Sequence, residues 1–208
     1  MKALTLSFLS TLATAAPYSS SQGMTSVYIS KCAAFGHLTY PSLSFTNVPG
    51  FQLTAVLYDS FFDTNGFVGY LPSDDSIYIA FQGSESTTNW LTDFDATKTQ
   101  YTSYPECNCQ VHQGFYLAQQ AVLDQVLTAV ADLKLQYPTA LVKTTGHSLG
   151  AAIATLTAMD LAKTYPDVQS YNYGSPRVGD PKFSAFAGTI MTDFWRVTHY
   201  KDCVPHVP

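Results

Sequence analysis

The feature that most constrains the fold is a serine between two glycines, at the point where an expected strand passes directly into an expected helix. Residues 146–150 read Gly-His-Ser-Leu-Gly and are followed by two alanines. Residues 141–145 read as a short strand, and residues 148–163 are dense in alanine, which favours a helix. Small residues on both sides of so sharp a turn avoid collisions with the adjoining strand and helix. The junction therefore predicts a strand–turn–helix unit.

Strand and helix continue to alternate after this junction. We expect strands at 168–173 and 194–199, with a short helix at 181–187 between them. Parallel strands connected by helices are buried on both faces, so a helix layer is needed on each side of the sheet. The sequence therefore predicts an α/β fold with a mostly parallel central sheet and helices on both faces.

The first half of the chain adds three strands and one long helix to this prediction. Residues 51–58, 66–71 and 76–81 are rich in aromatic and β-branched residues, and residues 63–66 suit a turn between the first two runs. The apolar residues of 112–137 recur at three and four positions, which is typical of an amphipathic helix. The residues of this apolar stripe are Phe115, Ala118, Val122, Val126, Val130 and Leu133.

The N-terminus has the pattern of a secretory signal peptide. Lys2 gives a short positive start, residues 3–13 are mostly apolar, and residues 13–16 are small enough for a signal peptidase. The apolar run is too short to span a membrane, and no other stretch approaches the required length. We expect residues 1–16 to be a signal peptide, residues 17–208 to form one domain, and the protein to be secreted.

Charge and composition narrow the classes of partner. The formal net charge is −5, and only 12% of the residues are charged. Binding to phosphates needs clustered cations, so this composition excludes nucleic acid as a partner. Fourteen tyrosines and thirteen phenylalanines suit a large core and an apolar binding face. With no internal repeat or charge block to divide the chain, we expect a single domain. We also expect a monomer and no cofactor.

Four cysteines leave the disulfide pattern open. An even count in a secreted chain suggests disulfides, and four cysteines allow three pairings. Cys107 and Cys109 are separated only by Asn108, so a bond between them would close a small ring. Pairing of either with Cys32 or Cys203 is equally open. No second cysteine pair or suitably spaced histidines accompany them, which argues against a metal site.

Ser148 is a candidate nucleophile because of its place between strand and helix. In that setting Gly-X-Ser-X-Gly lifts the serine hydroxyl clear of the sheet, and the helix N-terminus favours developing negative charge. A chance match of five residues is the alternative, and the surrounding strand and helix argue against it. His147 is adjacent and points another way, so we expect it to be a buried, hydrogen-bonded support rather than the base.

Five further stretches match a known family in order. They are "PGFQLTAVLYDSFFDTNGFVGY" (49–70), "IAFQGSESTTNWLTDFD" (79–95), "VHQGFYLA" (111–118), "YNYGSPRVGD" (171–180) and "RVTHYKDCVPHVP" (196–208). Together with the serine motif they resemble the fungal class 3 lipases, a family that also includes feruloyl esterases. The resemblance implies an α/β-hydrolase fold and a secreted carboxylic-ester hydrolase that acts on a lipid or another apolar ester. A triacylglycerol lipase is the leading expectation, and a feruloyl or phenolic-ester esterase is the alternative.

The resemblance also implies an oxyanion hole. It maps to Ser84, which would donate its backbone N–H and its hydroxyl, and to the backbone N–H of Leu149. Acyl transfer creates an oxyanion, and such preset donors lower the barrier by several kcal/mol. The other reading of Ser84 is an ordinary turn serine after a strand. Gln82 stands where the family often has arginine, which should weaken the anchoring of this loop more than catalysis.

A short helical lid is implied at residues 86–92. Trp90 would lie over the acyl groove when the lid is closed and meet lipid, including an oil–water interface, when it is open. A buried structural tryptophan is the other reading. The feruloyl esterases tend to lack an aromatic residue at this place, so Trp90 favours a lipid substrate.

Asp202 is the candidate catalytic acid. A serine hydrolase of this fold has its nucleophile, acid and histidine in that chain order, with the acid after a later strand. Asp202 follows the strand expected to end near residue 199, and it matches the family's acid. Asp160, Asp167 and Asp180 are weaker rivals, because they lie on or after a helix or in a structural loop.

The histidine is the difficulty. The histidines of the chain are His37, His112, His147, His199 and His206. Only the last follows Asp202, in a loop where Pro205 and Pro208 leave it little freedom, and the resemblance gives it a non-catalytic place. The family's base comes several dozen residues later, in a Gly-Tyr-X-His segment that this sequence does not contain. We therefore expect a Ser-His-Asp acyl-enzyme mechanism whose histidine is missing from these 208 residues, in a domain incomplete at its C-terminus. A catalytically inactive fragment and His206 as the base are the other expectations.

Overall fold

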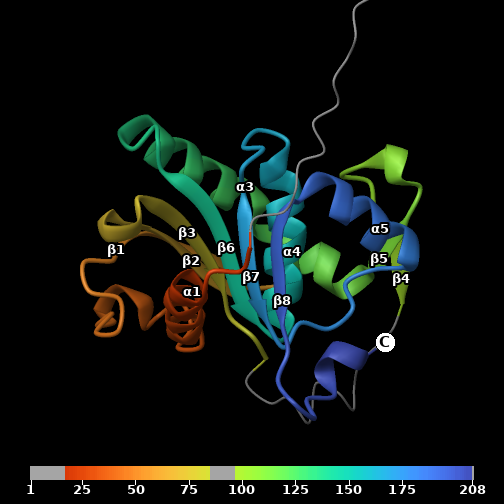
Figure 1. Ribbon diagram of the computed structural model, residues 1–208, viewed down its shortest axis with the longest axis horizontal. Helices are drawn as coiled ribbons and strands as arrows, with labels where there is room; N and C mark the ends of the chain where they lie inside the picture. The colour runs from red at the N-terminus through yellow and green to blue at the C-terminus, as the bar shows by residue number, and fades with distance from the viewer. Residues whose placement is uncertain (1–16, 85–96, 208) are drawn as a thin grey trace, which may run out of the picture.

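A six-stranded sheet forms the centre of the protein, seen in a computed structural model that describes residues 17–84 and 97–207 (Figure 1). The strand order is β1-β2-β3-β6-β7-β8. These strands are β1 (Gln52–Asp59), β2 (Thr64–Leu71), β3 (Ser76–Phe81), β6 (Leu141–His147), β7 (Gln169–Tyr173) and β8 (Asp193–Val197). The first three are antiparallel, whereas β3, β6, β7 and β8 are parallel. The predicted mostly parallel sheet is confirmed.

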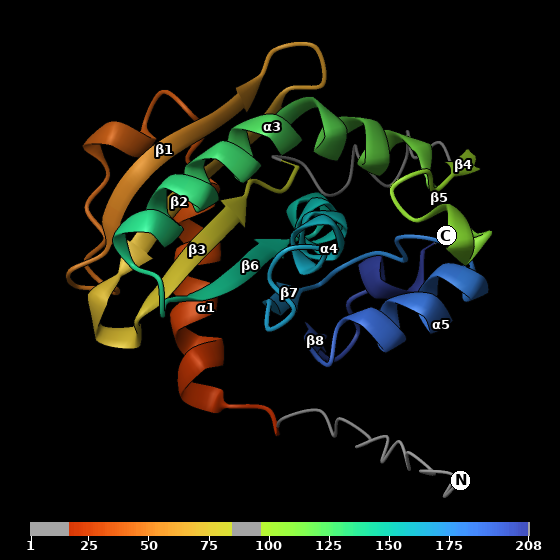
Figure 2. The same cartoon turned by 90° about the horizontal axis from the view of Figure 1, so that it is seen from above.

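Helices cover both faces of the sheet. Among the described residues the helices are α1 (Ser20–Ala33), α3 (Gln113–Gln136), α4 (Leu149–Ala162) and α5 (Pro181–Ile190). Short 3-10 helices are η1 (Tyr40–Ser42), η2 (Pro72–Asp74), η3 (Pro105–Cys107) and η4 (Val204–His206). Seen from above, α3 and α4 lie on one side of the strands and α1 lies on the other (Figure 2). None of the helices in the described ranges is long and apolar enough to cross a membrane.

The side chains of β3 show how one strand supplies both cores. Ile77, Ile79 and Phe81 belong to the apolar cluster beneath α3 and α4, while Tyr78 and Ala80 belong to the cluster beneath α1. Successive side chains of a strand point to opposite faces, so a strand buried on both sides needs an apolar residue at nearly every position. This is why the central strands read as continuous apolar runs.

The long helix follows its predicted stripe. All six residues of the apolar stripe of 112–137 are buried in α3. By contrast, α4 is buried almost all around and packs against β6, β7 and α3. A helix enclosed on every side can approach its neighbours closely only with small side chains, which explains its alanines.

Helix α1 was not predicted, and polar contacts attach it to the sheet. The hydroxyl of Tyr171 donates to Gln22 Oε1 at 2.8 Å, and that of Tyr173 donates to the Gly23 carbonyl at 2.5 Å. Burial raises the pKa of Tyr173 above its ordinary value, so this phenol remains a donor well above neutral pH. Ser19 caps the helix by accepting from the Gln22 N–H at 3.4 Å.

The turn between β1 and β2 lies earlier than the residues 63–66 expected for it. Residues 60–63 form the turn, and β2 already begins at Thr64. The Asp59 carboxylate accepts from the backbone N–H groups of Phe61 and Phe62 at 3.1 and 2.8 Å. An aspartate that bonds the backbone two and three residues on closes a turn locally. This turn-forming aspartate stands at the end of β1.

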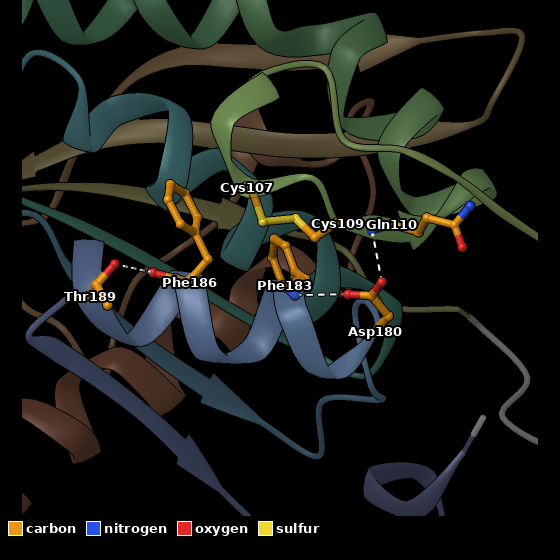
Figure 3. Close-up of a disulfide and its surroundings, with 7 residues drawn as sticks. All are labelled: Cys107, Cys109, Gln110, Asp180, Phe183, Phe186 and Thr189. Carbon is orange, nitrogen blue, oxygen red and sulfur yellow. Dashed lines mark hydrogen bonds between the residues drawn. A yellow bond between two sulfur atoms is a disulfide. The ribbon is translucent and has the colours of Figure 1, made fainter.

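A disulfide between Cys107 and Cys109 resolves one of the pairings left open by the sequence (Figure 3). It lies beside the small sheet of β4 (Lys98–Gln100) and β5 (Gln110–His112), and its two Cα atoms are 5.1 Å apart. Asp180 accepts from the backbone N–H groups of Gln110 and Phe183, which ties this region to the start of α5. Cys32 and Cys203 carry no disulfide in the described part of the chain.

Candidate functional site

Ser148 occupies a strained turn between β6 and α4. Its backbone has φ 55° and ψ −121°, and it is the N-cap residue of α4. A non-glycine residue with positive φ is uncommon and costs energy, so the surrounding structure must hold it in place. The Ser148 N–H donates to the carbonyl of Tyr173 on β7 at 3.0 Å. The turn is therefore fixed from the neighbouring strand.

Gly146 and Gly150 allow the close packing that this turn requires. A Cβ atom on Gly146 would collide with the carbonyl group of Gly150 and lie 2.7 Å from the backbone nitrogen of Ala151. A Cβ atom on Gly150 would collide with the carbonyl oxygen of Phe81, at the end of β3. These contacts are with backbone atoms, which cannot rotate away. The sequence predicted collisions with the adjoining strand and helix; in the structure Gly146 meets the start of α4, and Gly150 meets the end of β3.

This packing predicts a large loss of stability for Gly150→Ala. The new Cβ forces α4 away from β3, and we expect the free energy of unfolding to fall by about 3 kcal/mol. Gly188→Ala in α5 is the matched control, because nothing lies within 4 Å of its Cβ position. That change should stabilise the helix by about 0.5–1 kcal/mol. Urea denaturation measures both, and equal stabilities of the two variants would contradict the close approach.

The Ser148 hydroxyl is buried at the start of α4. The residue is 1% exposed, and within residues 17–84 and 97–207 its Oγ has no hydrogen-bond partner. A buried hydroxyl without a partner costs free energy, so a purely structural role does not explain it. It lies at the N-terminus of α4, whose dipole favours negative charge.

Both candidate oxyanion donors flank this serine. Leu149 is the first residue of α4, and the first N–H groups of a helix have no partner within it. Ser84 directly follows Gly83, whose Cβ position lies 2.6 Å from the His147 carbonyl oxygen and 3.6 Å from Ser148 Cβ. The loop after β3 therefore passes directly over the turn, as an oxyanion hole requires.

Gln82 anchors this loop from two directions. Its backbone N–H donates to the carbonyl of Asn65 at 2.9 Å, and its side-chain Nε2 donates to the carbonyl of Ala34 at 3.1 Å. The glutamine thus connects the loop that carries Ser84 with β2 and with the end of α1.

Asp202 lies at the same edge of the sheet. Its Oδ2 is 2.9 Å from the Cβ position of Gly174, the residue after Tyr173, and Tyr173 accepts from the Ser148 N–H. Its Oδ1 accepts from the Val204 N–H at 3.0 Å. The parallel strands β6, β7 and β8 end at this edge (Figure 1). The structure therefore brings the candidate acid and the candidate nucleophile to one edge of the sheet.

Arg196 holds the loop that carries this acid. Its guanidinium donates to the carbonyl of Ser175 at 2.5 and 3.1 Å and to the carbonyl of Pro205 at 2.7 Å. The Arg177 N–H donates to the carbonyl of Val207 at 2.9 Å. These bonds fix residues 199–207 against the loop after β7.

The three weaker candidates for the catalytic acid, Asp160, Asp180 and Asp167, lie in positions typical of structural residues. Asp160 is buried and accepts from Lys163 at 2.6 Å and from Gln119 at 3.0 Å. Asp180 caps α5, and Asp167 is exposed in the turn after α4. In the described ranges, none of these three accepts a hydrogen bond from residues 146–150.

One expectation about the histidines is wrong. His147 is exposed rather than buried, because it ends β6 at the open edge of the sheet, where its Nε2 faces Gly174, a residue without a side chain. His206 is also exposed, in η4, and its backbone N–H donates to the Cys203 carbonyl. Within residues 17–84 and 97–207, no hydrogen bond joins the ring of either histidine to Asp202.

A cleft of about 560 Å³ opens beside the oxyanion donors. It is lined by residues 35–39, 62–65 and 82–84 together with Ala118, Leu149 and Ile153. The first segment includes His37, which no sequence pattern connects with the site. A larger cavity of about 670 Å³ lies between α5 and β8 and shares no lining residue with this cleft.

Two expectations fall outside the described residues, namely the lid residue Trp90 and the signal peptide at 1–16. Within the described residues, no group of three or more potential ligand side chains could hold a metal ion.

Comparisons with known proteins agree with this geometry. A family model described as "Lipase (class 3)" matches residues 78–208. A lipase of Rhizomucor miehei is 37% identical over 152 residues, which cover 71% of this chain and 41% of that protein. The secreted mono- and diacylglycerol lipase A of Penicillium cyclopium is 36% identical over 148 residues, which cover 70% of this chain and 47% of that protein.

The fold agrees with solved structures as well. One is a triacylglycerol lipase whose catalytic centre is described as a serine protease triad. It superposes with a TM-score of 0.78 at 29% identity, covering 92% of this chain and 76% of that one. The protein thus has the α/β-hydrolase fold. The alignments span less than half the length of the curated relatives.

Proposed function

The chain belongs to the class 3 lipase family, and from that premise we propose that it is the part of a serine ester hydrolase that carries the nucleophile, the oxyanion donors and the acid. We propose triacylglycerols as the substrate class and an acyl-enzyme as the intermediate. The observation that carries the proposal is the turn at Ser148, a strained backbone whose buried hydroxyl has no partner among the described residues.

The reaction assigns one role to each of these residues. The Ser148 oxygen attacks the ester carbonyl carbon while its proton passes to a general base, and the carbonyl oxygen becomes an oxyanion. The N–H of Leu149 and the donors of Ser84 stabilise that oxyanion. Collapse of the intermediate releases the alcohol, which takes the proton from the base, and leaves the acyl group on Ser148. Water then attacks the acyl-enzyme, and the carboxylic acid is released with a second proton transfer through the base.

Asp202 is the residue that orients the base. In this reaction type a buried or half-buried carboxylate accepts a hydrogen bond from the imidazole, which fixes its tautomer and stabilises its charged form. We propose that the imidazole comes from a histidine that follows Asp202 in the active protein, as the family resemblance implies. The solved triacylglycerol lipase with a serine protease triad at its catalytic centre supports this assignment.

Secretion and interface binding belong to the same proposal. The signal-like residues 1–16 and the secreted relative from Penicillium cyclopium support an extracellular enzyme. The position of Trp90, in a stretch that resembles a lid, supports contact with lipid at an oil–water interface. We propose a monomer that binds its lipid substrate there.

A lipase fusion tests the substrate class. In this fusion, residue 208 is followed by the C-terminal segment of the Rhizomucor miehei lipase that lies beyond the aligned part. We expect hydrolysis of trioctanoylglycerol to rise steeply once the substrate forms an emulsion, because an open lid exposes apolar surface. Trp90→Ala should blunt this rise more than it lowers hydrolysis of soluble p-nitrophenyl butyrate.

Other outcomes point elsewhere. Preference for methyl ferulate over every glyceride would support the phenolic-ester alternative. Equal losses of Trp90→Ala on emulsified and soluble esters would indicate a buried structural tryptophan. A folded fusion without any ester hydrolysis would contradict the proposed function and favour an inactive protein.

A further inference from the structure

Four buried polar side chains lie between α4 and the sheet, next to the turn that contains Ser148. They belong to Thr144 on β6, Ser170 and Asn172 on β7, and Thr155 on α4, and each residue is at most 3% exposed. Asn172 stands opposite Gly146, the first glycine of the turn, in the sheet register. Burying a polar group costs free energy unless it is hydrogen-bonded, and apolar side chains would fill this contact without that cost. The cluster therefore calls for a role beyond filling space.

Hydrogen bonds connect these side chains into a chain that ends on the first turn of α4. Asn172 Nδ2 donates to Ser170 Oγ and to Thr155 Oγ1, both at 3.0 Å. Ser170 Oγ and Thr144 Oγ1 share a hydrogen bond of 2.8 Å. The Thr155 hydroxyl donates its only proton to the Ala151 carbonyl at 2.8 Å, so it can only accept from Asn172. Such a chain sets one position of α4 along β7, because hydrogen bonds are directional and apolar contacts are not.

Two successive residues of β7 thus hold the turn that contains Ser148. The carbonyl oxygen of Tyr173 accepts from the Ser148 N–H at 3.0 Å. The side chain of Asn172 reaches the Ala151 carbonyl through Thr155. A non-glycine residue at φ 55° persists only where the surrounding structure fixes it. One attachment acts on the turn itself, and the other acts on the helix that follows it.

The position of this first helical turn decides where the candidate oxyanion donor lies. Leu149 is the first residue of α4. The Ser148 carbonyl accepts from the N–H groups of Ala151 and Ala152 at 3.0 and 3.3 Å, so a shift of the helix along β7 moves Ser148 and the Leu149 N–H as well. Donors stabilise an oxyanion only at hydrogen-bond distance from the place where it forms. A displacement of about 1 Å can cost about 100-fold in rate.

We infer that Asn172, acting through Thr155, is a positioning residue that fixes Ser148 and the Leu149 N–H for acyl transfer. The inference rests on the proposed ester hydrolase function, because it concerns the same nucleophile and the same oxyanion hole. Asn172 is fully buried and lies out of reach of a substrate, so its effect falls on the rate constant rather than on affinity. A purely structural role predicts the reverse pattern, namely lower stability with unchanged turnover.

Asn172→Leu separates these two roles. Leucine has nearly the shape of asparagine, and it also removes Asn172 Oδ1, a buried acceptor without a partner among the described residues. Thr155 still donates to Ala151, and Ser170 and Thr144 still bond to each other. We expect the urea midpoint of the 208-residue chain to stay the same or rise, because no donor is orphaned. In the lipase fusion, kcat on p-nitrophenyl butyrate should fall about 10- to 100-fold at an unchanged KM.

Three further variants locate the effect in this chain of hydrogen bonds. Thr155→Val keeps the shape of the side chain but removes the hydroxyl, so it should lower kcat to a similar extent and gives the same comparison if leucine does not fit at 172. Thr155→Ser retains the hydroxyl and should keep kcat close to that of the unchanged fusion. Thr157→Val is the matched control, because Thr157 is 1% exposed on the same helix and its Oγ1 has no partner in the described ranges. It should leave kcat unchanged and should not lower the urea midpoint.

Hydrogen exchange tests the positioning without any hydrolysis. The N–H groups of Ala151 and Ala152 close the first turn of α4 on the Ser148 carbonyl. In the 208-residue chain, followed by NMR, their exchange should be about tenfold faster in Asn172→Leu, because this turn opens locally. Thr157→Val should leave their exchange unchanged.

Three results would overturn the inference. They are unchanged exchange at Ala151 and Ala152 in Asn172→Leu, an unchanged kcat of this variant in an active fusion, and a loss that appears in KM instead of kcat. These results are distinguishable from a failure of the proposed function, which would show as an unchanged fusion that hydrolyses no ester. In that case the exchange measurement alone decides whether Asn172 holds the turn.

Discussion

Replacing Ser148 by alanine should abolish ester hydrolysis in the lipase fusion, with a loss in kcat on the order of 10⁶. The alkoxide that attacks the ester carbonyl comes from this hydroxyl, and the oxyanion donors alone cannot replace it. Hydrolysis of p-nitrophenyl butyrate measures the loss. A serine-reactive phosphonate should label the unchanged fusion at Ser148, located by peptide mass spectrometry, and should leave the variant unlabelled.

The same substitution should leave the fold intact. The Ser148 Oγ is buried and has no partner among the described residues, so its removal deletes an uncompensated polar atom and leaves no orphaned group. We expect the midpoint of thermal unfolding to stay the same or rise. Ser184→Ala on the exposed face of α5 is the matched control and should retain full activity. Hydrolysis by Ser148→Ala at a rate close to that of the unchanged fusion, or labelling at another serine, would refute the assignment.

The fold was predictable where local patterns and tertiary burial agree. The stripe of α3 and the apolar run of β3 could be read from sequence, because each is set by a period of 3.6 or by burial on both faces. Helix α1 could not be read in this way. Its buried residues include Gly23, Ser26 and Ser30, so the buried face of the helix is marked by small side chains rather than by hydrophobic ones. The capping Ser19 was the remaining signal.

The candidate site was likewise predictable only where its residues are adjacent in the sequence. The turn at Ser148 is formed by residues adjacent in the sequence, so the glycine spacing predicted a tightly packed turn, although not that Gly150 would meet the end of β3. The cleft is formed by five separate segments, and nothing local to His37 indicates that it lines the same cleft as Ser84. The turn expected at residues 63–66 lies at 60–63 instead, and the hydrogen bond between the His37 ring and Asn65 depends on tertiary structure.

The error over His147 has a physical cause. His147 was expected to be buried because its side chain points away from Ser148, but at the end of β6 that direction leads out of the core. The carboxyl ends of the strands lie at an edge where the chain turns away, so the terminal side chain is released from the core. The same edge is where α/β proteins place their ligands.

Residues 17–208 contain no histidine that the family resemblance assigns as the general base, and this leads to a prediction about their activity. Residues 17–208 alone should hydrolyse p-nitrophenyl butyrate more than a thousandfold more slowly than the lipase fusion. Ser148 without an imidazole remains a weakly nucleophilic alcohol near neutral pH. The donors of Ser84 and Leu149 should still keep the rate about a thousandfold above that in water, since such sites retain this much when a triad is broken.

His206 supplies the opposing prediction. If its imidazole were the base, residues 17–208 would turn over esters at the rate of the fusion, and His206→Ala would remove that activity. The structure argues against this, because His206 is exposed in η4, between two residues that Arg196 and Arg177 hold through their backbone carbonyls. A ring in that position needs a rearrangement of the whole loop to reach Ser148. Full activity of residues 17–208, lost in His206→Ala and retained in His199→Ala, would establish that this rearrangement occurs and would make the fusion segment unnecessary for catalysis.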